Sequence, residues 1–274
     1  MEFQNNYTLP KMIADSVNKY SELPAQFKRQ KNGEFVPVTY REMFQASLDF
    51  GAALLQLGVK REEPIGLISD NRTEWLQADF GILSIGAIDV PRGCDATPLD
   101  LEKILSTTEC RFVIAENNSQ INKIVSLRDK LPKIEAIITF DIKENIKPEV
   151  LEAAKTNKIT IYYFSELLKE GQKWRIEHVG EVEAELEKGT IEDTATIIFT
   201  SGTTGTPKGV MLSHKNFLTQ LDEIVERIYL NPGEKSLNVL PVWHVFEREV
   251  EYVILIQGAA ICYSKPVGSI LLAD

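Results

Sequence analysis

Short apolar runs alternate with amphipathic segments along most of this chain, from residue 40 almost to its end. Such runs, rich in Ile and Val and bounded by polar residues, are typical of strands buried on both faces of a sheet. The strands expected on this basis are 64–68, 87–90, 112–114, 136–138, 159–162, 197–199, 210–212 and 237–240. Because strands and helices alternate, we predict an α/β fold with mostly parallel sheets flanked by helices.

The amphipathic segments have apolar residues three or four positions apart, which predicts helices that pack one face on the sheet. A helix beginning near Tyr40 should end at Gly58, because glycine readily adopts the left-handed conformation that often follows a helix. A second helix over residues 72–85 should end at Gly86 for the same reason. The Thr-Pro pair at residues 97–98 is typical of an N-cap and a first helical residue, so a third helix should begin there.

Composition and charge exclude some classes of protein. The chain has 274 residues, of which 43% are hydrophobic, and a chain of this size buries roughly 70–75% of its unfolded surface. Forty acidic residues against thirty basic ones give a net charge of −10, which argues against a nucleic-acid partner. An anionic ligand would therefore depend on local donors and local positive charge, not on the charge of the whole protein.

The sequence contains no signal for secretion or membrane insertion. Residues 1–6 lack a basic region and an apolar core, and no apolar stretch approaches the ~20 residues that span a bilayer. Cys94, Cys110 and Cys262 are far apart, without metal-binding spacing, and we expect them to be small buried hydrophobic residues. These features together favour a reducing, cytoplasmic location.

One segment rich in glycine and hydroxyl groups lies between two apolar runs. Residues 200–209 read Thr-Ser-Gly-Thr-Thr-Gly-Thr-Pro-Lys-Gly. Glycines let backbone N–H groups turn inward, hydroxyls add rotatable donors, and Lys208 adds a positive charge. The Gly-Lys-Ser/Thr order of the general nucleotide loop is absent, and a flexible surface turn rarely needs ten such residues. We therefore predict a phosphate loop of another kind, with a triphosphate as its natural ligand.

Two charged segments are expected to face solvent. Residues 177–188 are rich in glutamate and poor in apolar residues, which favours a solvated linker over a metal or partner site. We therefore predict an N-terminal α/β subdomain over 1–188 and the start of a second subdomain over 189–274. Arg248 should lie on an exposed charged helix face, with a role near phosphate as the alternative. Its acidic neighbours on that face are Glu247, Glu249 and Glu251.

Three segments resemble signature segments of the adenylate-forming superfamily, which includes acyl-CoA synthetases, luciferases and peptide-synthetase adenylation domains. Residues 200–209 match its Ser/Thr-Ser-Gly-Thr-Thr-Gly-x-Pro-Lys-Gly signature at every fixed position. Residues 240–248, Leu-Pro-Val-Trp-His-Val-Phe-Glu-Arg, resemble its acyl-pocket segment in the form most similar to long-chain fatty acid–CoA ligases. Residues 86–93 are similar to its Gly-Ala-x-x-x-Pro segment. All three occur in the family order, and the likeness extends over nearly the whole chain from about Tyr7.

The resemblance implies a two-step reaction that uses ATP, Mg²⁺, a fatty acid and coenzyme A. A carboxylate attacks the α-phosphorus of ATP and releases pyrophosphate, and the thiol of coenzyme A then attacks the acyl-adenylate. Because the first step brings two anions together, catalysis rests on positioning and charge neutralisation. Charge-assisted hydrogen bonds to the phosphates would contribute about 1.5–3 kcal/mol each. The nucleotide-binding residues implied are Thr200, Ser201, Gly202, Thr203, Thr204, Gly205, Thr206, Lys208 and Gly209, with Thr204 also contacting the metal.

The same resemblance makes His244 the catalytic residue that orients the substrate carboxylate, with Trp243 and His244 contacting the acyl substrate. Without that context, a histidine here would more often be a packed core residue, and Trp243 would equally be plain core. Some long-chain members place a gating tryptophan four residues after this histidine, where the present chain has Arg248, so that gate does not carry over. Arg92 and Gly93 have no partner that the sequence identifies, and we assign them no catalytic role.

Several family segments have no counterpart before Asp274. The adenine, ribose and C-terminal lid segments are missing, so we expect an N-terminal portion of a longer enzyme that cannot complete adenylation alone. An acyl-CoA ligase is the first interpretation, transfer to a carrier protein or other acceptor the second, and a non-catalytic nucleotide-binding fragment the third. Because the substrate is lipid-soluble, contact with the inner face of a membrane is an open alternative, although no basic amphipathic helix supports it. Acyl-chain length and oligomeric state cannot be derived from the sequence.

Overall fold

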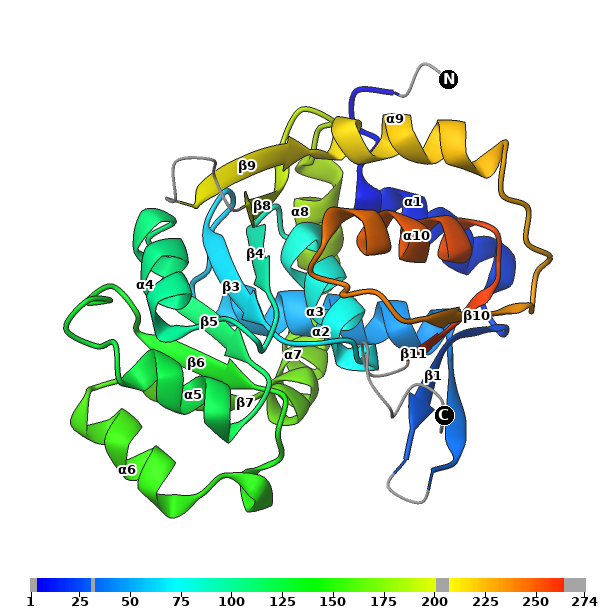
Figure 1. Cartoon of the computed structure of the whole chain (residues 1–274). Helices are drawn as coiled ribbons and strands as arrows, with labels where there is room; N and C mark the ends of the chain where they lie inside the picture. Colours follow the sequence, from blue (N-terminus) through cyan, green and yellow to red (C-terminus); the bar gives the residue numbers. More distant parts are fainter. Residues whose placement is uncertain (1–3, 31–32, 201–206, 264–274) are drawn as a thin grey trace.

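Seven strands form the larger of two sheets in the computed structural model, which describes residues 4–30, 33–200 and 207–263 (Figure 1). Their order is β7-β6-β5-β3-β4-β8-β9, and all neighbours are parallel except the β8–β9 hairpin. The strands are β3 (Pro64–Ile68), β4 (Ile88–Arg92), β5 (Phe112–Ala115), β6 (Ala136–Thr139), β7 (Thr160–Tyr163), β8 (Thr194–Thr200) and β9 (Lys208–Ser213). This arrangement confirms the predicted α/β fold with mostly parallel strands.

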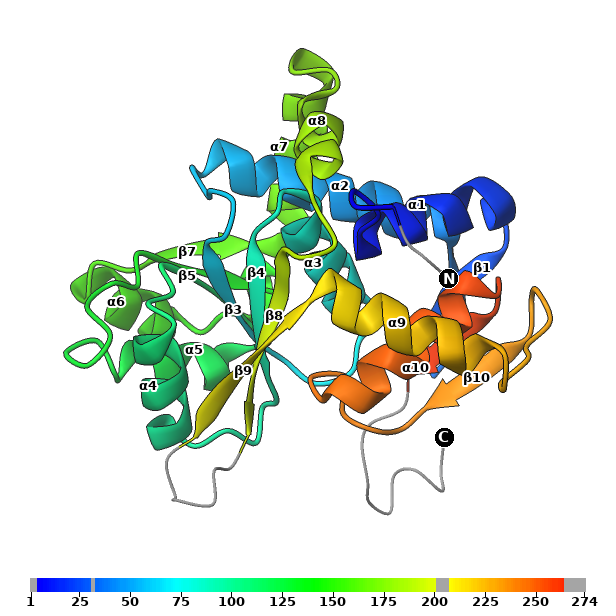
Figure 2. The same cartoon turned by 90° about the horizontal axis from the view of Figure 1, so that it is seen from above.

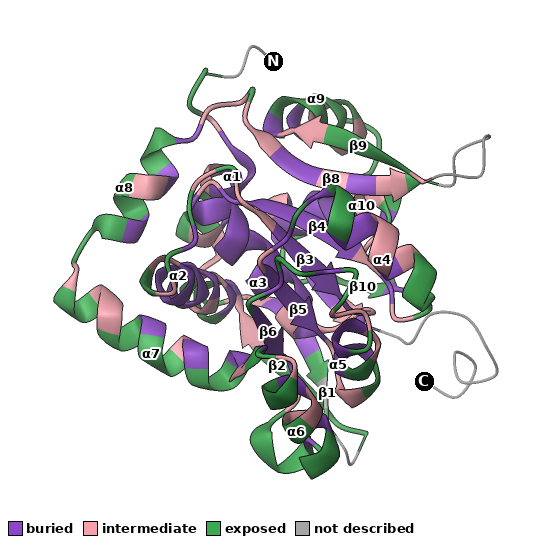
Figure 3. Cartoon of the chain, turned by 90° about the vertical axis from the view of Figure 1, so that its left-hand side faces the viewer, coloured by how far each residue is buried: buried purple, intermediate pink, exposed green. Residues whose placement is uncertain are grey.

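Helices cover both faces of this sheet (Figure 2). Alternate residues of β5 enter two separate cores: Phe112 and Ile114 join one, and Val113 and Ala115 join the other. The first core is completed by α2 (Tyr40–Gln56), α3 (Thr73–Ser84) and α7 (Phe164–Glu177). The second is completed by α4 (Pro98–Thr107), α5 (Asn118–Val125) and α6 (Pro148–Thr156), which follows the short 3-10 helix η1 (Lys143–Asn145). The central strands are therefore buried on both sides (Figure 3), which explains their unbroken apolar sequences.

A smaller sheet has the strand order β10-β11-β1-β2. Its strands are β1 (Pro24–Arg29), β2 (Phe35–Thr39), β10 (Lys235–Asn238) and β11 (Ala260–Tyr263). It contacts α10 (Val245–Ile256), and α1 (Leu9–Tyr20) and α9 (His214–Val225) pack on α10 in turn (Figure 1). β1 pairs with β11, and in the larger sheet β4 pairs with β8. Both sheets thus combine strands from either side of residue 188. The predicted division into subdomains 1–188 and 189–274 stays a prediction.

The predicted helix ends agree with the structure. Thr39 caps α2 through a capping box with Glu42, and Thr97 caps α4 in the same way with Asp100. After α2 and α3, Gly58 and Gly86 adopt φ values of +80° and +70°. At both positions the chain turns through a conformation that a side chain would strain, so the glycines end the helices for the reason predicted from the sequence.

The acidic segment is solvated, as predicted, but it is helical and not a linker. Residues 177–188 include the end of α7 and all of α8 (Glu181–Lys188), and most of the glutamates of α8 are exposed. Val182 and Leu186, four positions apart, are buried and anchor α8 to the first core. Apolar residues at helical spacing thus bury one side of α8, and ion pairs of its glutamates, such as Glu187 with Lys11 at 2.8 Å, add to its attachment.

Two further expectations concern the burial of the cysteines and membrane-spanning helices. Cys110 is buried as expected, but Cys94 and Cys262 are only half-buried. Within residues 4–30, 33–200 and 207–263, no helix has both the length and the apolar character needed to cross a bilayer.

Candidate active site at the carboxyl edge of the larger sheet

The carboxyl ends of β3, β4, β5 and β8 meet at one edge of the larger sheet, because these strands are parallel neighbours. The chain leaves β3 toward α3 on one face, and it leaves β4 and β5 toward α4 and α5 on the other. The loops after these strands therefore diverge. In open α/β sheets, ligands bind in the crevice where neighbouring loops diverge in this way.

The predicted phosphate loop joins β8 to β9 at this edge. Thr200 pairs with Lys208 across the hairpin, and both residues are exposed at the end of the described strands. Gly209 lies opposite Phe199, where a Cβ atom would approach the Phe199 ring to 3.1 Å, so the glycine leaves room for that ring. The remaining predicted residues, Ser201, Gly202, Thr203, Gly205, Thr206 and the metal candidate Thr204, lie outside the described residues. The hairpin matches the prediction, and the roles assigned to its residues stay predictions.

The segment before His244 is fixed to the end of β3 by a single asparagine. Asn71 donates from Nδ2 to the carbonyl of Leu240 at 2.7 Å, and its Oδ1 accepts from the N–H of Val242 at 2.9 Å. Both ends of one amide therefore hold the backbone on either side of Pro241. This clamp brings a segment 171 positions further along the chain to the carboxyl edge of the sheet.

Trp243 contacts the last residue of β4 and the glycine that follows it. The guanidinium of Arg92 lies 4.4 Å from the centroid of the Trp243 ring and pairs with Asp95 at 3.0 Å. A Cβ atom on Gly93 would lie only 2.2 Å from Nε1 of Trp243, so the indole occupies the space that a side chain would need. The sequence assigned no role to Arg92 or Gly93, and the structure makes them the neighbours of a predicted substrate-binding residue.

His244 is the N-cap of α10, and its side chain is exposed. Its Nδ1 accepts a hydrogen bond from the N–H of Phe246 at 3.3 Å. Because Nδ1 is the acceptor, the neutral ring carries its proton on Nε2. This arrangement leaves His244 able to donate to an anion at the edge of the sheet while it caps the helix.

The prediction that Arg248 lies on an exposed charged face is wrong. Arg248 is fully buried, and its guanidinium contacts Asp79 on α3, Asp89 on β4 at 3.0 Å and the Tyr252 hydroxyl at 2.7 Å. Glu247 and Glu251 are buried as well. Charged residues enter a core only when partners compensate them, and these partners lie far away in the sequence.

Burial changes the acid–base properties of this cluster. It raises the pKa of Asp79 and that of Asp89, although the positive charge of Arg248 opposes the shift. Burial also raises the pKa of Glu247 to about 7. For Arg248 burial acts in the opposite direction, but the charges of Asp79 and Asp89 raise its pKa overall. Arg248 therefore stays charged and joins α10, which carries His244, to both α3 and β4.

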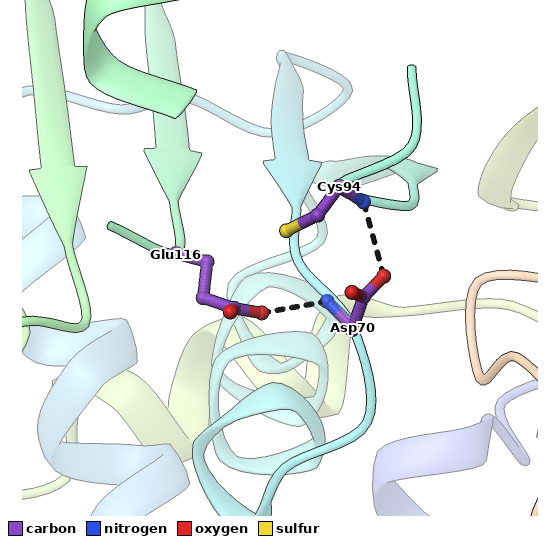
Figure 4. A group of neighbouring side chains, drawn as sticks. All are labelled: Asp70, Cys94 and Glu116. Carbon is purple, nitrogen blue, oxygen red and sulfur yellow. Dashed lines mark hydrogen bonds between the residues drawn. The ribbon is translucent and has the colours of Figure 1, made fainter. Parts of the chain in front are cut away.

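Asp70, Cys94 and Glu116 gather where β3, β4 and β5 end (Figure 4). Among the described residues, they form the one group of three or more acidic, thiol or imidazole side chains whose ligand atoms all lie within 4.8 Å. Asp70 Oδ1 accepts from the N–H of Cys94 at 3.0 Å, and Glu116 Oε2 accepts from the N–H of Asp70 at 2.8 Å.

The carboxylates of Asp70 and Glu116 thus join the loops after the three strands by accepting from backbone N–H groups, and the three side chains do not form a prepared metal site. Burial, together with the charges of Glu116 and Asp70, raises the pKa of the Cys94 thiol, so the thiolate that a metal requires is disfavoured. Neither this group nor Asn71 was predicted from the sequence. A signal was present, because Asp70, Asn71 and Glu116 are polar residues that come shortly after predicted strands.

A large cavity lined by described residues lies away from this edge. A cleft of about 960 Å³ runs between α1 and α9, and its apolar floor includes Met12, Leu218 and Leu221. None of the predicted site residues lines it. We therefore place the candidate active site at the carboxyl edge, where the hairpin and the Trp243–His244 segment are attached.

Comparisons with known proteins show the family of this chain. The sequence profile described as "AMP-binding enzyme" matches residues 13–272. Arabidopsis thaliana long-chain-fatty-acid–[acyl-carrier-protein] ligase AEE15, chloroplastic, is 33% identical over 232 residues, covering 83% of this chain and 31% of that protein. Arabidopsis thaliana long chain acyl-CoA synthetase 4 is 28% identical over 272 residues, covering 94% of this chain and 39% of that protein.

Solved structures share the fold. The anthranilate CoA ligase AuaEII in complex with anthranoyl-AMP superposes with a TM-score of 0.79 at 20% identity, covering 98% of this chain and 47% of that one. The adenylation domain of a carboxylate reductase from Mycobacterium chelonae superposes with a TM-score of 0.77 at 20% identity, covering 94% and 42%. The chain thus spans less than half the length of each of these four proteins.

Proposed function

This chain belongs to the AMP-binding enzyme family, and we propose that it supplies the N-terminal part of an enzyme that activates a long-chain fatty acid with ATP. In the first step the carboxylate attacks the α-phosphorus, the bond to the β-phosphate breaks, and pyrophosphate leaves. In the second step a thiol attacks the acyl carbonyl and AMP leaves. The thioester that remains is acyl-CoA when the thiol is coenzyme A.

The observation that carries this proposal is the attachment of Trp243 and His244 to the strand ends beside the phosphate hairpin. Trp243 lies against Arg92 at the end of β4, and β4 is the sheet neighbour of β8, which leads into the hairpin. The acid-binding and ATP-binding segments are therefore held by adjacent parallel strands. Bringing two anionic substrates together at such an edge is the main demand of the first step.

The described residues fit an anionic nucleotide. Lys208 is exposed at the beginning of β9, opposite Thr200, where its ammonium group can reach a phosphate. The proposed roles are that residues 200–209 hold the phosphates and that Mg²⁺, bound with ATP, neutralises their charge. His244 would donate from Nε2 to the substrate carboxylate and orient it for attack, without forming a covalent bond itself.

An apolar substrate is supported by the surroundings of His244. Leu240 and Phe246 flank the Trp243–His244 pair and are 41% and 56% exposed. Large apolar side chains this open are suited to contact a hydrocarbon chain. We therefore place the acyl chain along this segment, with Trp243 as one wall.

Transfer to a carrier protein is the second candidate for the last step. It is favoured by the 33% identity to AEE15, whose name specifies an acyl-carrier-protein ligase. Coenzyme A and a carrier protein both present a phosphopantetheine thiol, so the chemistry of thioester formation is the same. The two acceptors differ in whether a protein surface must dock.

Fatty-acid-dependent exchange of pyrophosphate into ATP tests the first step, in protein expressed from the complete gene. We expect exchange in the wild type and a loss of about 10²-fold or more in Lys208→Ala and in His244→Ala, the usual cost of removing an electrostatic or positioning group. Lys215→Ala, which removes an exposed lysine paired with Glu192, is the control. Undiminished exchange in both site variants would refute the assigned roles. Coenzyme A and a purified holo carrier protein, offered in parallel, then separate the two acceptors.

A further inference from the structure

The ring of Trp243 is held from two sides by Arg92, the last residue of β4, and by Gly93, which follows it. Arg92 covers its face at 4.4 Å, and Gly93 provides the space for its Nε1 edge. Arg92 also pairs with Asp95 at 3.0 Å, which favours this position of the guanidinium. A planar guanidinium stacked on tryptophan is a strong form of cation–π contact, and a lysine cannot reproduce the stacking.

The backbone before the ring is also fixed. Asn71, in the loop after β3, binds the backbone of Leu240 and Val242, so the main chain just before Trp243 is held in one position. The loop after β3 thus fixes the backbone, and Arg92 and Gly93 at the end of β4 fix the indole. The half-buried ring of Trp243 is therefore held in one position at the carboxyl edge. The other two tryptophans differ, because Trp75 is fully buried and Trp174 stacks on His178.

We propose that Arg92 and Gly93 are positioning residues that hold Trp243 as a selector of the acyl group. This inference rests on the proposed function and adds how the enzyme would discriminate among acids. A ring clamped at one place presents a wall of constant shape, so an acid whose chain matches it gains contact that longer, shorter or branched acids lose. Releasing the ring should change which acids are preferred, and the capacity for adenylation should be retained.

The preference for acids of different length is tested by pyrophosphate exchange with a series of straight-chain acids, in protein from the complete gene. For each variant, the ratio of kcat/KM between the best acid and an acid two carbons shorter is measured. We expect Arg92→Ala and Gly93→Ala to change this ratio by about tenfold, the effect of misfitting a methylene group in an apolar pocket. Arg92→Lys should lie between Arg92→Ala and the wild type.

A double-mutant comparison separates positioning from general damage. In Trp243→Ala, adding Arg92→Ala should leave the ratio unchanged, because the ring through which Arg92 acts is gone. Arg111→Ala is the matched control, since Arg111 lies 5.1 Å from the Phe112 ring and pairs with Glu63 at the opposite edge of the sheet. It should leave the ratio as in the wild type.

Acrylamide quenching of tryptophan emission gives a readout besides activity. The difference between the wild type and Trp243→Phe isolates the emission of Trp243, and quenching of that emission should increase in Arg92→Ala. If Gly93→Ala fails to fold, the Arg92 series still decides the question. Wild-type exchange with an unchanged ratio in Arg92→Ala overturns the inference and leaves the proposed function intact. No exchange with any acid in the wild type overturns both.

Discussion

The guanidinium of Arg248 lies 3.0 Å from the carboxylate of Asp89, and neither side chain is exposed to solvent. Arg248 follows His244 by one helical turn, and its N–H donates to the His244 carbonyl at 3.2 Å. The buried ion pair therefore fixes the beginning of α10, and with it the exposed imidazole, to the strand that also carries Arg92.

Replacing Arg248 by alanine should destabilise the protein by about 3–5 kcal/mol, because Asp79 and Asp89 would lose their compensating charge in the core. Urea unfolding followed by circular dichroism measures this change. The triple variant Arg248→Met, Asp79→Leu and Asp89→Leu, which removes the charges together, should recover much of the loss. A loss below about 1 kcal/mol in Arg248→Ala, the range of surface ion pairs, would contradict the role assigned to the buried cluster.

Acid should destabilise the protein through His214. Burial lowers the pKa of this side chain from 6.5 to about 4, and its Nδ1 accepts from the N–H of Leu9 at 3.3 Å, joining α9 to α1. Between pH 6.5 and 4 the unfolded chain binds a proton that the folded protein does not, so stability rises with pH in this window and falls as pH decreases. The His214 contribution amounts to about 3 kcal/mol across the window.

The test compares wild type with His214→Asn, whose Oδ1 can still accept from Leu9 but does not titrate. Urea midpoints measured from pH 4 to pH 7 should fall less steeply on acidification in the variant. Parallel curves for the two proteins would show that His214 is not the titrating group.

The two hydrogen bonds of the Asn71 amide can be tested separately by substitution. Asn71→Asp keeps an acceptor for the N–H of Val242 but cannot donate to the carbonyl of Leu240, whereas Asn71→Ala loses both bonds. Hydrogen exchange at Val242 should stay slow in Asn71→Asp and accelerate in Asn71→Ala. The alanine variant leaves a buried donor unpaired, which costs about 1–3 kcal/mol. Equal exchange at Val242 in both variants would exclude the proposed clamp.

Gly58 and Gly86 provide a matched pair for backbone strain. Both have positive φ, but a Cβ atom at Gly58 meets nothing within 4 Å, whereas one at Gly86 would lie 2.4 Å from Cζ of Arg61. Gly58→Ala should therefore cost about 1–2 kcal/mol, the usual penalty of the left-handed conformation. Gly86→Ala should cost more, because Arg61 would have to leave Glu185 and Asp193. Thermal unfolding of the two variants checks this order, and equal losses would contradict it.

Much of the fold could be predicted from local sequence. The strands 64–68 and 112–114, the helix ends at Gly58 and Gly86 and the cap at Thr97 all depend on neighbours a few residues away, and all agree with the structure. Apolar periodicity and turn chemistry are short-range properties, so they can be read from short windows of sequence. The hairpin at residue 200 was predictable for the same reason.

Predictions failed where partners distant in sequence decide the outcome. Arg248 was expected in solvent because its neighbours are glutamates, yet it is buried because Asp79, 169 positions earlier, compensates it. Acidic composition at residues 177–188 concealed Val182 and Leu186, which needed a core to pack on. In both segments, composition described the residues correctly but carried no information about what would lie beside them.

The chain sequence alone thus established the class of fold, the phosphate-loop signature and the family of the protein, because these depend on residue types at close spacing. Tertiary structure decided that Asn71, Arg92 and Gly93 hold the Trp243–His244 segment at the carboxyl edge. The physical reason is that parallel strands bring their carboxyl ends together whatever their separation in sequence. Side chains more than a hundred residues apart become neighbours there only once the sheet has formed.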